Sequence, residues 1–137
     1  MIPISNQNPR DTAILFSLLE ERLAILMTAD KIFVQKNLSL AIVSGMLHTN
    51  INYLSQVINN RLHTNFNDYI NSYRVKEACV LLQQNDFEKH TVEYVGDRVG
   101  FSSRSTYYFC FKKFMGVSPA VFQKKQHKEI TPQSNRK

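Results

Sequence analysis

The second half of the chain repeats the first, and this repeat limits the possible fold more than any other feature. Val95 falls on Val43 at a shift of 52 residues, and after a one-residue insertion Phe111 falls on Ile58 at a shift of 53. The other matched pairs are Val99 with Leu47, Gly100 with His48, Tyr107 with Leu54, Cys110 with Val57, Gly116 with His63, Ser118 with Asn65 and Phe122 with Tyr69. Each copy reads as a short helix, a tight turn and a second short helix, which is the helix-turn-helix plan. Two copies are too few for a stacked solenoid.

Helical spacing of apolar residues, together with cap residues, predicts an all-α chain without a sheet. The predicted helices cover residues 12–35, 40–47, 51–59, 66–84, 92–99 and 103–116, and a last one begins at Ser118-Pro119. The predicted caps are Asp11 or Thr12, Ser39, Asn50, Asn65, Ser102 or Ser103, and Ser118. We expect a flexible N-terminus (1–11), an N-terminal helix (12–37), a first helix-turn-helix unit (38–65), a linker helix (66–85), a second unit with its closing helix (86–126) and a basic tail (127–137). The N-terminal helix either covers the first unit or presents a homodimer surface.

Positive charge gathers in the last third of the chain. Residues 1–60 hold four basic and four acidic residues, residues 61–97 hold four basic and six acidic ones, and residues 98–137 hold nine basic residues against Glu129 alone. Such a segment suits a polyanionic partner, which is DNA, RNA or a membrane surface, and a solvated tail is the alternative.

Other sequence features narrow the class of protein. No apolar run approaches the roughly 18 residues of a membrane span, and the N-terminus lacks the form of a signal peptide. Cys79 and Cys110 each lie inside a helical pattern, so we expect no disulfide framework and a cytoplasmic location. The histidines have no metal-ligand spacing with either cysteine, and there is no phosphate-binding glycine loop and no nucleophile beside a base. We therefore predict that the protein is not an enzyme and uses no cofactor or metal.

The second helix of the first copy carries an uncharged polar stripe. Its predicted core face holds Ile51, Leu54, Val57 and Ile58. Its opposite face holds, at helical spacing, Asn52, Ser55, Gln56 and Asn59. Solvated faces usually carry Lys and Glu, whereas amides can pair with adenine through two hydrogen bonds. We predict base reading by this stripe, with a solvated face as the alternative.

The second helix of the second copy combines a basic residue with aromatic ones. Its predicted core face holds Tyr107, Cys110, Phe111 and Phe114, and its opposite face holds Arg104, Ser105, Tyr108, Phe109 and Lys112. Arg104 lies in the first turn and could reach O6 and N7 of guanine. Tyr108 and Phe109 could contact thymine methyl groups or pack against another helix. The predicted phosphate contacts, which position a protein without reading sequence, are Asn59, Arg74, Lys112, Lys113, Lys124 and Lys125. A solubilising surface is the alternative for the lysines.

Three stretches of the chain match a known pattern: residues 49–59 (TNINYLSQVIN), residues 100–107 (GFSSRSTY) and residues 111–119 (FKKFMGVSP). They resemble the AraC/XylS family of bacterial transcription regulators. Residues 65–71 (NFNDYIN), which lead to Arg74 and Ala78, resemble the linker helix of that family. The likeness covers about residues 30–125.

This resemblance implies a seven-helix, all-α domain in which a long central helix joins two helix-turn-helix subdomains. It also implies binding to double-stranded promoter DNA, with RNA polymerase or another regulator as a protein partner. Two recognition helices about 34 Å apart would enter successive major grooves and span roughly 16–20 base pairs. By position, the base-reading residues are Asn52, Ser55 and Gln56 in the first copy and Arg104, Ser105, Tyr108 and Phe109 in the second.

The chain departs from the family pattern at three positions. His48 and His63 stand where the family usually has turn glycines, and histidine tolerates a left-handed backbone better than most residues. Phe109 stands where many relatives have a basic residue. About 30 residues precede the likeness, too few for an effector-sensing domain, so we expect a free-standing small regulator or the end of a longer one.

Two other functions fit parts of the sequence. A protein-interaction module would use the polar stripe and Tyr108-Phe109, and it would show no salt-dependent affinity for duplex DNA. Association with RNA or a membrane through residues 112–137 alone would be lost on deletion of residues 126–137.

Overall fold

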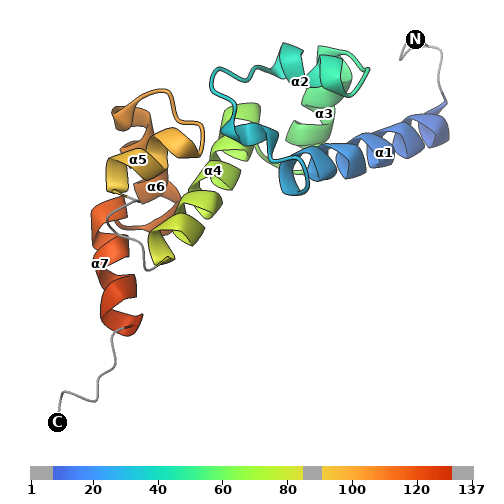
Figure 1. The fold of residues 1–137 in the computed structure, drawn as a ribbon. Helices are drawn as coiled ribbons and strands as arrows, with labels where there is room; N and C mark the ends of the chain where they lie inside the picture. The colour runs from blue at the N-terminus through green and yellow to red at the C-terminus, as the bar shows by residue number, and fades with distance from the viewer. Residues whose placement is uncertain (1–7, 85–90, 131–137) are drawn as a thin grey trace. The chain divides into compact units, whose positions relative to one another are not determined.

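The computed structural model describes residues 8–84 and 91–130, and within them the chain forms seven α-helices and no β-strand. The helices are α1 (Pro9–Thr28), α2 (Leu40–Met46), α3 (Ile51–Gln56), α4 (Phe66–Gln83), α5 (Val92–Arg98), α6 (Arg104–Met115) and α7 (Pro119–Ile130), as labelled in Figure 1. A 3-10 turn, η2 (Ile32–Val34), follows α1, and a π-helical turn, η3 (Val57–Arg61), prolongs α3. The predicted all-α class is confirmed. None of the described helices is both long enough and apolar enough to cross a membrane.

The helix predicted over residues 12–35 is wrong at both ends. Asn8 is the cap, because its side-chain oxygen accepts the amide hydrogen bond of Asp11 at 2.9 Å, and Pro9 begins the helix in the favoured cap-then-proline order. The expected boundary at residue 11 therefore falls inside α1. The helix ends at Thr28, and Lys31 has a φ of 49°, which no helix accommodates. Residues 1–7 of the expected flexible N-terminus and residues 131–137 of the expected basic tail lie outside the described residues.

Most of the other predicted caps are confirmed. Ser39, Asn50 and Ser103 each accept an amide hydrogen bond from the third residue of the helix that follows. Asn65 and Ser118 do the same at the starts of α4 and α7. The cap of α5 is Thr91, which the sequence analysis did not identify.

The chain divides into two compact units, of which the first comprises residues 1–32 and 37–70. In this unit α1 packs against η3, and the Phe16 ring meets the Tyr53 ring edge-on at 5.8 Å between centroids. The Arg61 guanidinium also pairs with Glu20 at 3.0 Å and donates to the Ser17 hydroxyl at 2.8 Å. Its buried apolar side chains are Leu19, Leu23, Met27, Ile32, Val43, Leu47, Tyr53, Leu54, Val57, Ile58 and Ile70. The N-terminal helix therefore covers the first helix-turn-helix unit.

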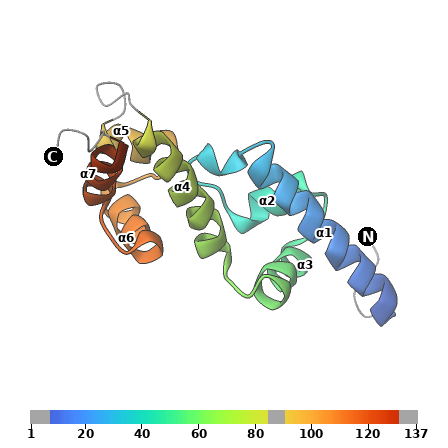
Figure 2. The same cartoon turned by 90° about the horizontal axis from the view of Figure 1, so that it is seen from below.

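The second unit comprises residues 33–36 and 71–137. Its core is formed by side chains of α4, α5, α6, α7 and the turn before α6: Val75, Ala78, Leu82, Val95, Val99, Phe101, Tyr107, Cys110, Phe111 and Phe122. The Phe111 ring meets Phe122 edge-on at 5.5 Å. Residues 33–36 join this unit through a stacked contact of Phe33 with Tyr73 and an ion pair between Lys36 and Asp97. Figure 2 shows α5, α6 and α7 gathered beside the α4 segment of this unit.

The structure confirms the internal repeat. Five matched pairs are buried in both copies: Val43 and Val95, Leu47 and Val99, Leu54 and Tyr107, Val57 and Cys110, and Ile58 and Phe111. The matched turn positions all have positive φ, namely His48 (57°), Gly100 (111°), His63 (55°) and Gly116 (82°). Each copy therefore folds to the same pattern of core and turn positions.

Two residues assigned to the core face are exposed. Ile51 is 46% exposed and Phe114 is 37% exposed, so both predictions are wrong. In α3 the buried position is taken by Tyr53, which is 2% exposed. The buried face of α3 is rotated toward α1, whose Phe16 contacts the Tyr53 ring, and Ile51 consequently points away from the core.

Candidate nucleic-acid interface

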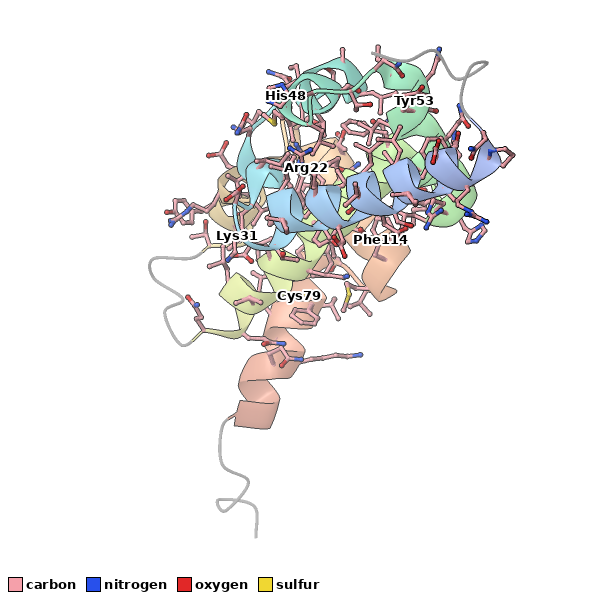
Figure 3. The ribbon with its side chains drawn as sticks, turned by 90° about the vertical axis from the view of Figure 1, so that its right-hand side faces the viewer. Arg22, Lys31, His48, Tyr53, Cys79 and Phe114 are labelled. Carbon is pink, nitrogen blue, oxygen red and sulfur yellow. The ribbon has the colours of Figure 1, made fainter. Side chains whose placement is uncertain are left out.

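Main-chain hydrogen bonds form the turn that joins α2 to α3. The His48 amide donates to the Gly45 carbonyl at 3.1 Å, and the Thr49 amide donates to the Ser44 carbonyl at 3.0 Å. The left-handed backbone of His48, labelled in Figure 3, reverses the chain. Asn50 then caps α3 at 2.8 Å. The direction of α3 is thus set by backbone and cap bonds, which leaves its outer side chains available for contacts with another molecule.

The turn between α5 and α6 is formed by main-chain hydrogen bonds equivalent to those of the turn between α2 and α3. The Gly100 amide donates to the Asp97 carbonyl at 3.2 Å, and the Phe101 amide donates to the Gly96 carbonyl at 3.1 Å. Ser103 caps α6 at 3.1 Å, as Asn50 caps α3 in the first copy. We call α3 and α6 the recognition helices because each is the second helix of its helix-turn-helix unit.

The predicted polar stripe of α3 lies on the surface of the first unit. Asn52 and Asn59 are exposed, whereas Ser55 and Gln56 are half-buried. The Asn59 side-chain amide donates to the Ser55 hydroxyl oxygen at 3.1 Å, so the two residues hold each other in place. The stripe offers neutral donors and acceptors, and such groups can read base edges without a charge.

Ile51 extends this surface at the start of α3. The repeat pairs Ile51 with Arg104, since both are the first residue of a recognition helix. An exposed aliphatic side chain at this position can contact the methyl group of thymine. Sequence analysis assigned Ile51 to the core, although the repeat already matched it with a predicted base-reading residue.

The outer face of α6 is more varied. Arg104 and Ser105 are exposed, and Phe109 is 68% exposed. Tyr108 is half-buried, and its hydroxyl donates to Oε2 of Glu93 on α5 at 2.8 Å. The predicted residues of α6 thus share one unit and one helix, but the Tyr108 hydroxyl is already engaged within the protein.

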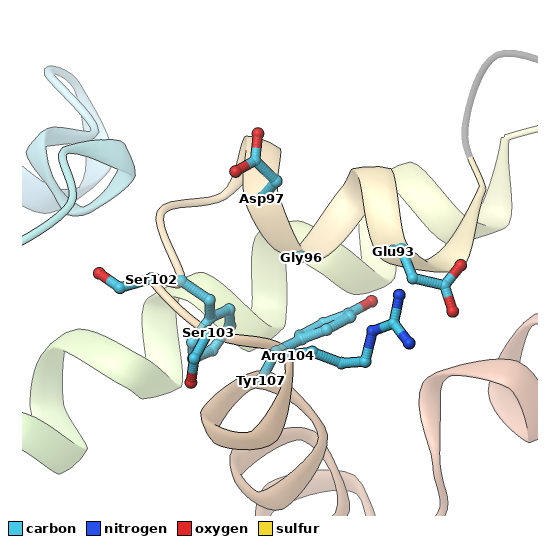
Figure 4. Close-up of a pocket in the computed structure, with 8 residues that line it drawn as sticks. Glu93, Gly96, Asp97, Ser102, Ser103, Arg104 and Tyr107 are labelled. Carbon is cyan, nitrogen blue, oxygen red and sulfur yellow. The ribbon is translucent and has the colours of Figure 1, made fainter.

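Glu93 is a residue of this surface that sequence analysis missed. The Tyr108 hydrogen bond, its own backbone amide and the nearby charge of Arg104 hold the pKa of the Glu93 carboxyl below its ordinary value. The pKa of Tyr108 is raised, first by burial and then by the same hydrogen bond. Figure 4 shows the Arg104 side chain extending from the first turn of α6 toward Glu93. Glu93 therefore holds the Tyr108 hydroxyl and lies within the influence of the Arg104 charge.

A hollow of about 200 Å³ lies between α5 and the start of α6 (Figure 4). It is lined by Glu93, Gly96, Asp97, Phe101, Ser102, Ser103, Arg104 and Tyr107. The Tyr107 ring is 1% exposed, and among the described residues its hydroxyl meets no hydrogen-bond partner. Burial raises the pKa of this hydroxyl, so Tyr107 stays neutral.

The four lysines predicted to contact phosphates are all exposed. Lys112 and Lys113 lie in the last turn of α6, and Lys124 and Lys125 lie on α7. The Lys113 ammonium also lies 5.6 Å from the centre of the Phe114 ring. The phosphate role of these lysines remains a prediction.

The guanidinium of Arg74, for which the sequence predicted a phosphate contact, donates three hydrogen bonds within the second unit. Nε donates to the Phe33 carbonyl at 2.7 Å, and Nη2 donates to the Gln35 carbonyl at 2.9 Å. Nη1 donates to the Asn71 side chain at 3.1 Å, and the group lies 5.7 Å from the centre of the Phe101 ring. Burial lowers the pKa of Arg74. Arg74 thus fastens residues 33–36 to α4 inside the second unit.

A family model described as "Helix-turn-helix domain" matches residues 43–125, which is more than half of the chain. The chain belongs to the AraC-type helix-turn-helix family. The matched residues run from α2 to α7 and include both recognition helices.

Several known proteins are similar to this chain over about two thirds to three quarters of its length. An uncharacterised helix-turn-helix transcriptional regulator of Bacillus subtilis is 25% identical over 92 residues, which is 67% of this chain but 12% of that regulator. The C-terminal domain of AraT, a response regulator from Geobacillus stearothermophilus, is 29% identical with a TM-score of 0.61, covering 69% of this chain and 76% of that one. A Listeria innocua protein of unknown function is 27% identical with a TM-score of 0.63, covering 77% of this chain and 94% of that one.

Proposed function

We propose that this AraC-type protein is a cytoplasmic transcription regulator that reads double-stranded promoter DNA with both recognition helices. In this proposal α3 and α6 enter successive major grooves. The observation that supports it best is the equivalence of the two turns, each of which presents a capped helix with exposed residues in its first turn. Asn52 is exposed in α3, and Arg104 and Ser105 are exposed in α6.

The two helices suit different base edges. On α3, the amides of Asn52 and Gln56 can pair with adenine, and Ser55 can donate or accept. On α6, Arg104 can donate two hydrogen bonds to guanine, while Tyr108 and Phe109 offer ring surface to thymine methyl groups. Ser105 completes the proposed base-reading set. The preferred site would thus contain an adenine contact in one half and a guanine contact in the other.

Phosphate contacts complete the proposal. Lys112, Lys113, Lys124 and Lys125 supply exposed charge in the second unit, and Asn59 supplies a neutral donor in the first. Each lysine that neutralises a phosphate releases condensed counterions, so affinity should fall steeply as salt concentration rises.

The decisive experiment compares two variants on two DNAs. A preferred site is first selected from random duplexes, and binding is then measured on this site and on a scrambled duplex over a range of salt. Arg104→Ala should weaken binding to the preferred site by about 1–3 kcal/mol and relax the choice of one base. Lys112→Ala should weaken binding to both duplexes alike and lower the salt slope by about one. Equal losses for Arg104→Ala on both duplexes would overturn its base-reading role, and affinity that does not depend on salt would favour the protein-interaction module.

The length of the protected DNA tests the use of both units. Two recognition helices in successive grooves should protect roughly 16–20 base pairs for a single chain. Gln56→Ala and Arg104→Ala should then relax base preference at positions about one helical turn apart. A shorter footprint, with preference altered by only one of the variants, would show that one unit alone contacts DNA.

The proposed protein partner is RNA polymerase or another regulator. The apolar side chains Phe114, Met115 and Val121 are exposed at the end of α6 and on α7, and such side chains suit a protein contact. Val121→Ser should therefore change transcription from a reporter promoter while leaving the affinity for DNA unchanged. A parallel loss of DNA affinity would contradict this assignment.

A further inference from the structure

The π-helical turn η3 (Val57–Arg61) changes which side chains continue the outer face of α3. An α-helix advances about 100° per residue, so in a regular α-helix Asn60 would lie about 20° around the axis from the buried Tyr53. A π-helix forms its hydrogen bonds to the fifth residue instead of the fourth and therefore advances less per residue. Over η3 this smaller advance turns Asn60 outward, toward the line of Asn52 and Gln56, and Asn60 is exposed. The π-helical turn thus adds Asn60 to the polar surface of the recognition helix.

The two neighbouring asparagines of η3 differ in their contacts. The Asn59 side-chain amide donates to the Ser55 hydroxyl oxygen at 3.1 Å. Within residues 8–84 and 91–130, no group forms a hydrogen bond with the Asn60 side chain. The Asn60 amide carries two N–H donors, and both can bind another molecule.

No charged side chain of the first recognition helix is placed to draw it to DNA. Arg61 is the one charged residue of α3 and η3. Its guanidinium pairs with Glu20 of α1 at 3.0 Å and donates to the Ser17 hydroxyl at 2.8 Å. The first unit as a whole holds four basic residues against five acidic ones: Arg10, Arg22, Lys31 and Arg61 against Asp11, Glu20, Glu21, Asp30 and Asp68. A phosphate contact by this helix is therefore left to a neutral donor.

The internal repeat pairs Asn60 with Lys113, at the shift of 53 residues. Lys113 is exposed in the last turn of α6, where a phosphate contact is proposed. N-terminal residues of a recognition helix contact base edges, so its last turn lies nearer to the sugar-phosphate backbone. We propose that the Asn60 side-chain amide donates a hydrogen bond to a DNA phosphate and anchors the first unit on the duplex without a charge. This role rests on the proposed binding to DNA.

A neutral donor differs from a lysine in its response to salt. It fixes the position of the first unit on the backbone but neutralises no phosphate, so its contribution should not depend on salt concentration. Asn60→Ala should weaken binding about fivefold to both the preferred site and the scrambled duplex, at every salt concentration. A loss confined to the preferred site would overturn the phosphate contact, because a base contact alone accounts for such a loss.

A lysine at this position would supply the charge that the second copy carries there. Asn60→Lys should raise the salt slope by about one, because its ammonium group would neutralise a phosphate. Gln83→Lys is the matched control, since Gln83 is an exposed amide at the end of α4. It adds the same charge outside both recognition helices and should change the slope much less. Equal slopes for the two lysine variants would overturn the inference.

Single uncharged phosphates would locate the contact. One methylphosphonate is placed at each position of the preferred site in turn, and the affinities of the native chain and Asn60→Ala are compared. At the contacted phosphate this replacement should weaken binding of the native chain about fivefold and binding of Asn60→Ala much less. Circular dichroism would establish that each variant keeps its helix content.

The outcomes separate this role of Asn60 from the proposed function. If no methylphosphonate position distinguishes the two proteins, Asn60 contacts no phosphate, whereas salt-dependent binding of the native chain would still support the proposed function. A native chain without affinity for duplex DNA would overturn both.

Discussion

Gly96 of α5 lies directly against the ring of Tyr107 on α6. A Cβ atom built on Gly96 would lie 2.3 Å from Cδ2 of that ring, and two further ring atoms would lie within 2.7 Å. The Tyr107 ring is 1% exposed and packs against the rings of Phe101 and Phe111, at 5.3 Å and 6.1 Å between centroids. The absence of a side chain at Gly96 therefore permits the close approach of the two helices in the second helix-turn-helix unit.

Gly96→Ala should consequently destabilise the protein. We expect a loss of about 1–3 kcal/mol in the free energy of unfolding, because the added methyl group overpacks a filled site. The matched control is Gly45→Ala in α2, where a Cβ would meet no atom within 4 Å. There alanine should raise stability by about 0.5–1 kcal/mol, since it is the better helix former. Urea unfolding of both variants gives the comparison, and a stabilised Gly96→Ala would refute the packing.

The first copy of the repeat suggests a pair of substitutions that could replace the contact between Gly96 and Tyr107. The repeat pairs Gly96 with Ser44 and Tyr107 with Leu54. At these two positions the first copy thus has a larger residue in α2 and a smaller one in α3 than the second copy has in α5 and α6. Gly96→Ser should destabilise the native chain, but in a Tyr107→Leu background its penalty should shrink by about 1 kcal/mol or more. A double-mutant cycle measures this difference. Equal penalties in the two backgrounds would mean that the two positions are not coupled.

The turn histidine of the first copy should be replaceable with a gain in stability. His48 has a φ of 57°, a backbone conformation that costs a residue with a Cβ about 1–2 kcal/mol. His48→Gly removes that strain and adds flexibility to the unfolded chain, so we expect a net gain of about 0.5–1 kcal/mol. His48→Ala keeps the Cβ and should bring no gain. Thermal unfolding of both variants distinguishes strain at the turn from any effect of the imidazole.

The contact between Glu93 and Tyr108 should make stability depend on pH. The pKa of Glu93 is lower in the folded protein than in the unfolded chain, chiefly because of the Tyr108 hydrogen bond. Its contribution is therefore present above the ordinary glutamate pKa of about 4.3 and is lost as the pH falls through the lower folded value. The difference in free energy of unfolding between the native chain and Glu93→Gln should be larger at pH 7 than at pH 3. Tyr108→Phe, which removes the donor, should reduce this pH dependence, and an unchanged profile would show that the contact is not its cause.

Ile51 should distinguish thymine from deoxyuridine. If α3 enters the major groove, Ile51 at its first position can contact a 5-methyl group, which deoxyuridine lacks. Replacing one thymine of the selected site by deoxyuridine should weaken binding of the native chain about fivefold, the effect of one buried methyl group. The same replacement should not affect Ile51→Ser. Asn52→Ala serves as the control, since it should weaken binding while keeping the preference for thymine.

Sequence patterns predicted the features that depend on local chemistry. Caps such as Ser39 and Asn50, the left-handed turns at His48 and Gly100, and the buried pairs of the repeat follow from residue types at fixed spacing. The outer face of α6 was also predicted, because Arg104 and Ser105 lie opposite a clear apolar stripe.

Features that depend on contacts between distant segments were not predicted. The misassigned Ile51 reflects the contact of Tyr53 with α1, which lies far from it in sequence. The structural contacts of Arg74 were missed for the same reason, since its guanidinium binds main-chain carbonyls about forty positions earlier. Glu93 was missed because its hydrogen bond to Tyr108 joins two helices across 15 positions. Periodicity along one helix carries no information on which other segment covers it.

The bonds that stabilise each of the two turns bear on how regulators of this kind diversify. Carbonyl and amide groups of the main chain, with one short polar cap, fix the direction of each recognition helix. Side chains such as Asn52, Gln56 and Arg104 take no part in those bonds. Substitution of these side chains therefore leaves the bonds that fix each turn in place. If these side chains read bases as proposed, a lineage that inherits this architecture can acquire new target promoters one base pair at a time, independently in each copy of the repeat.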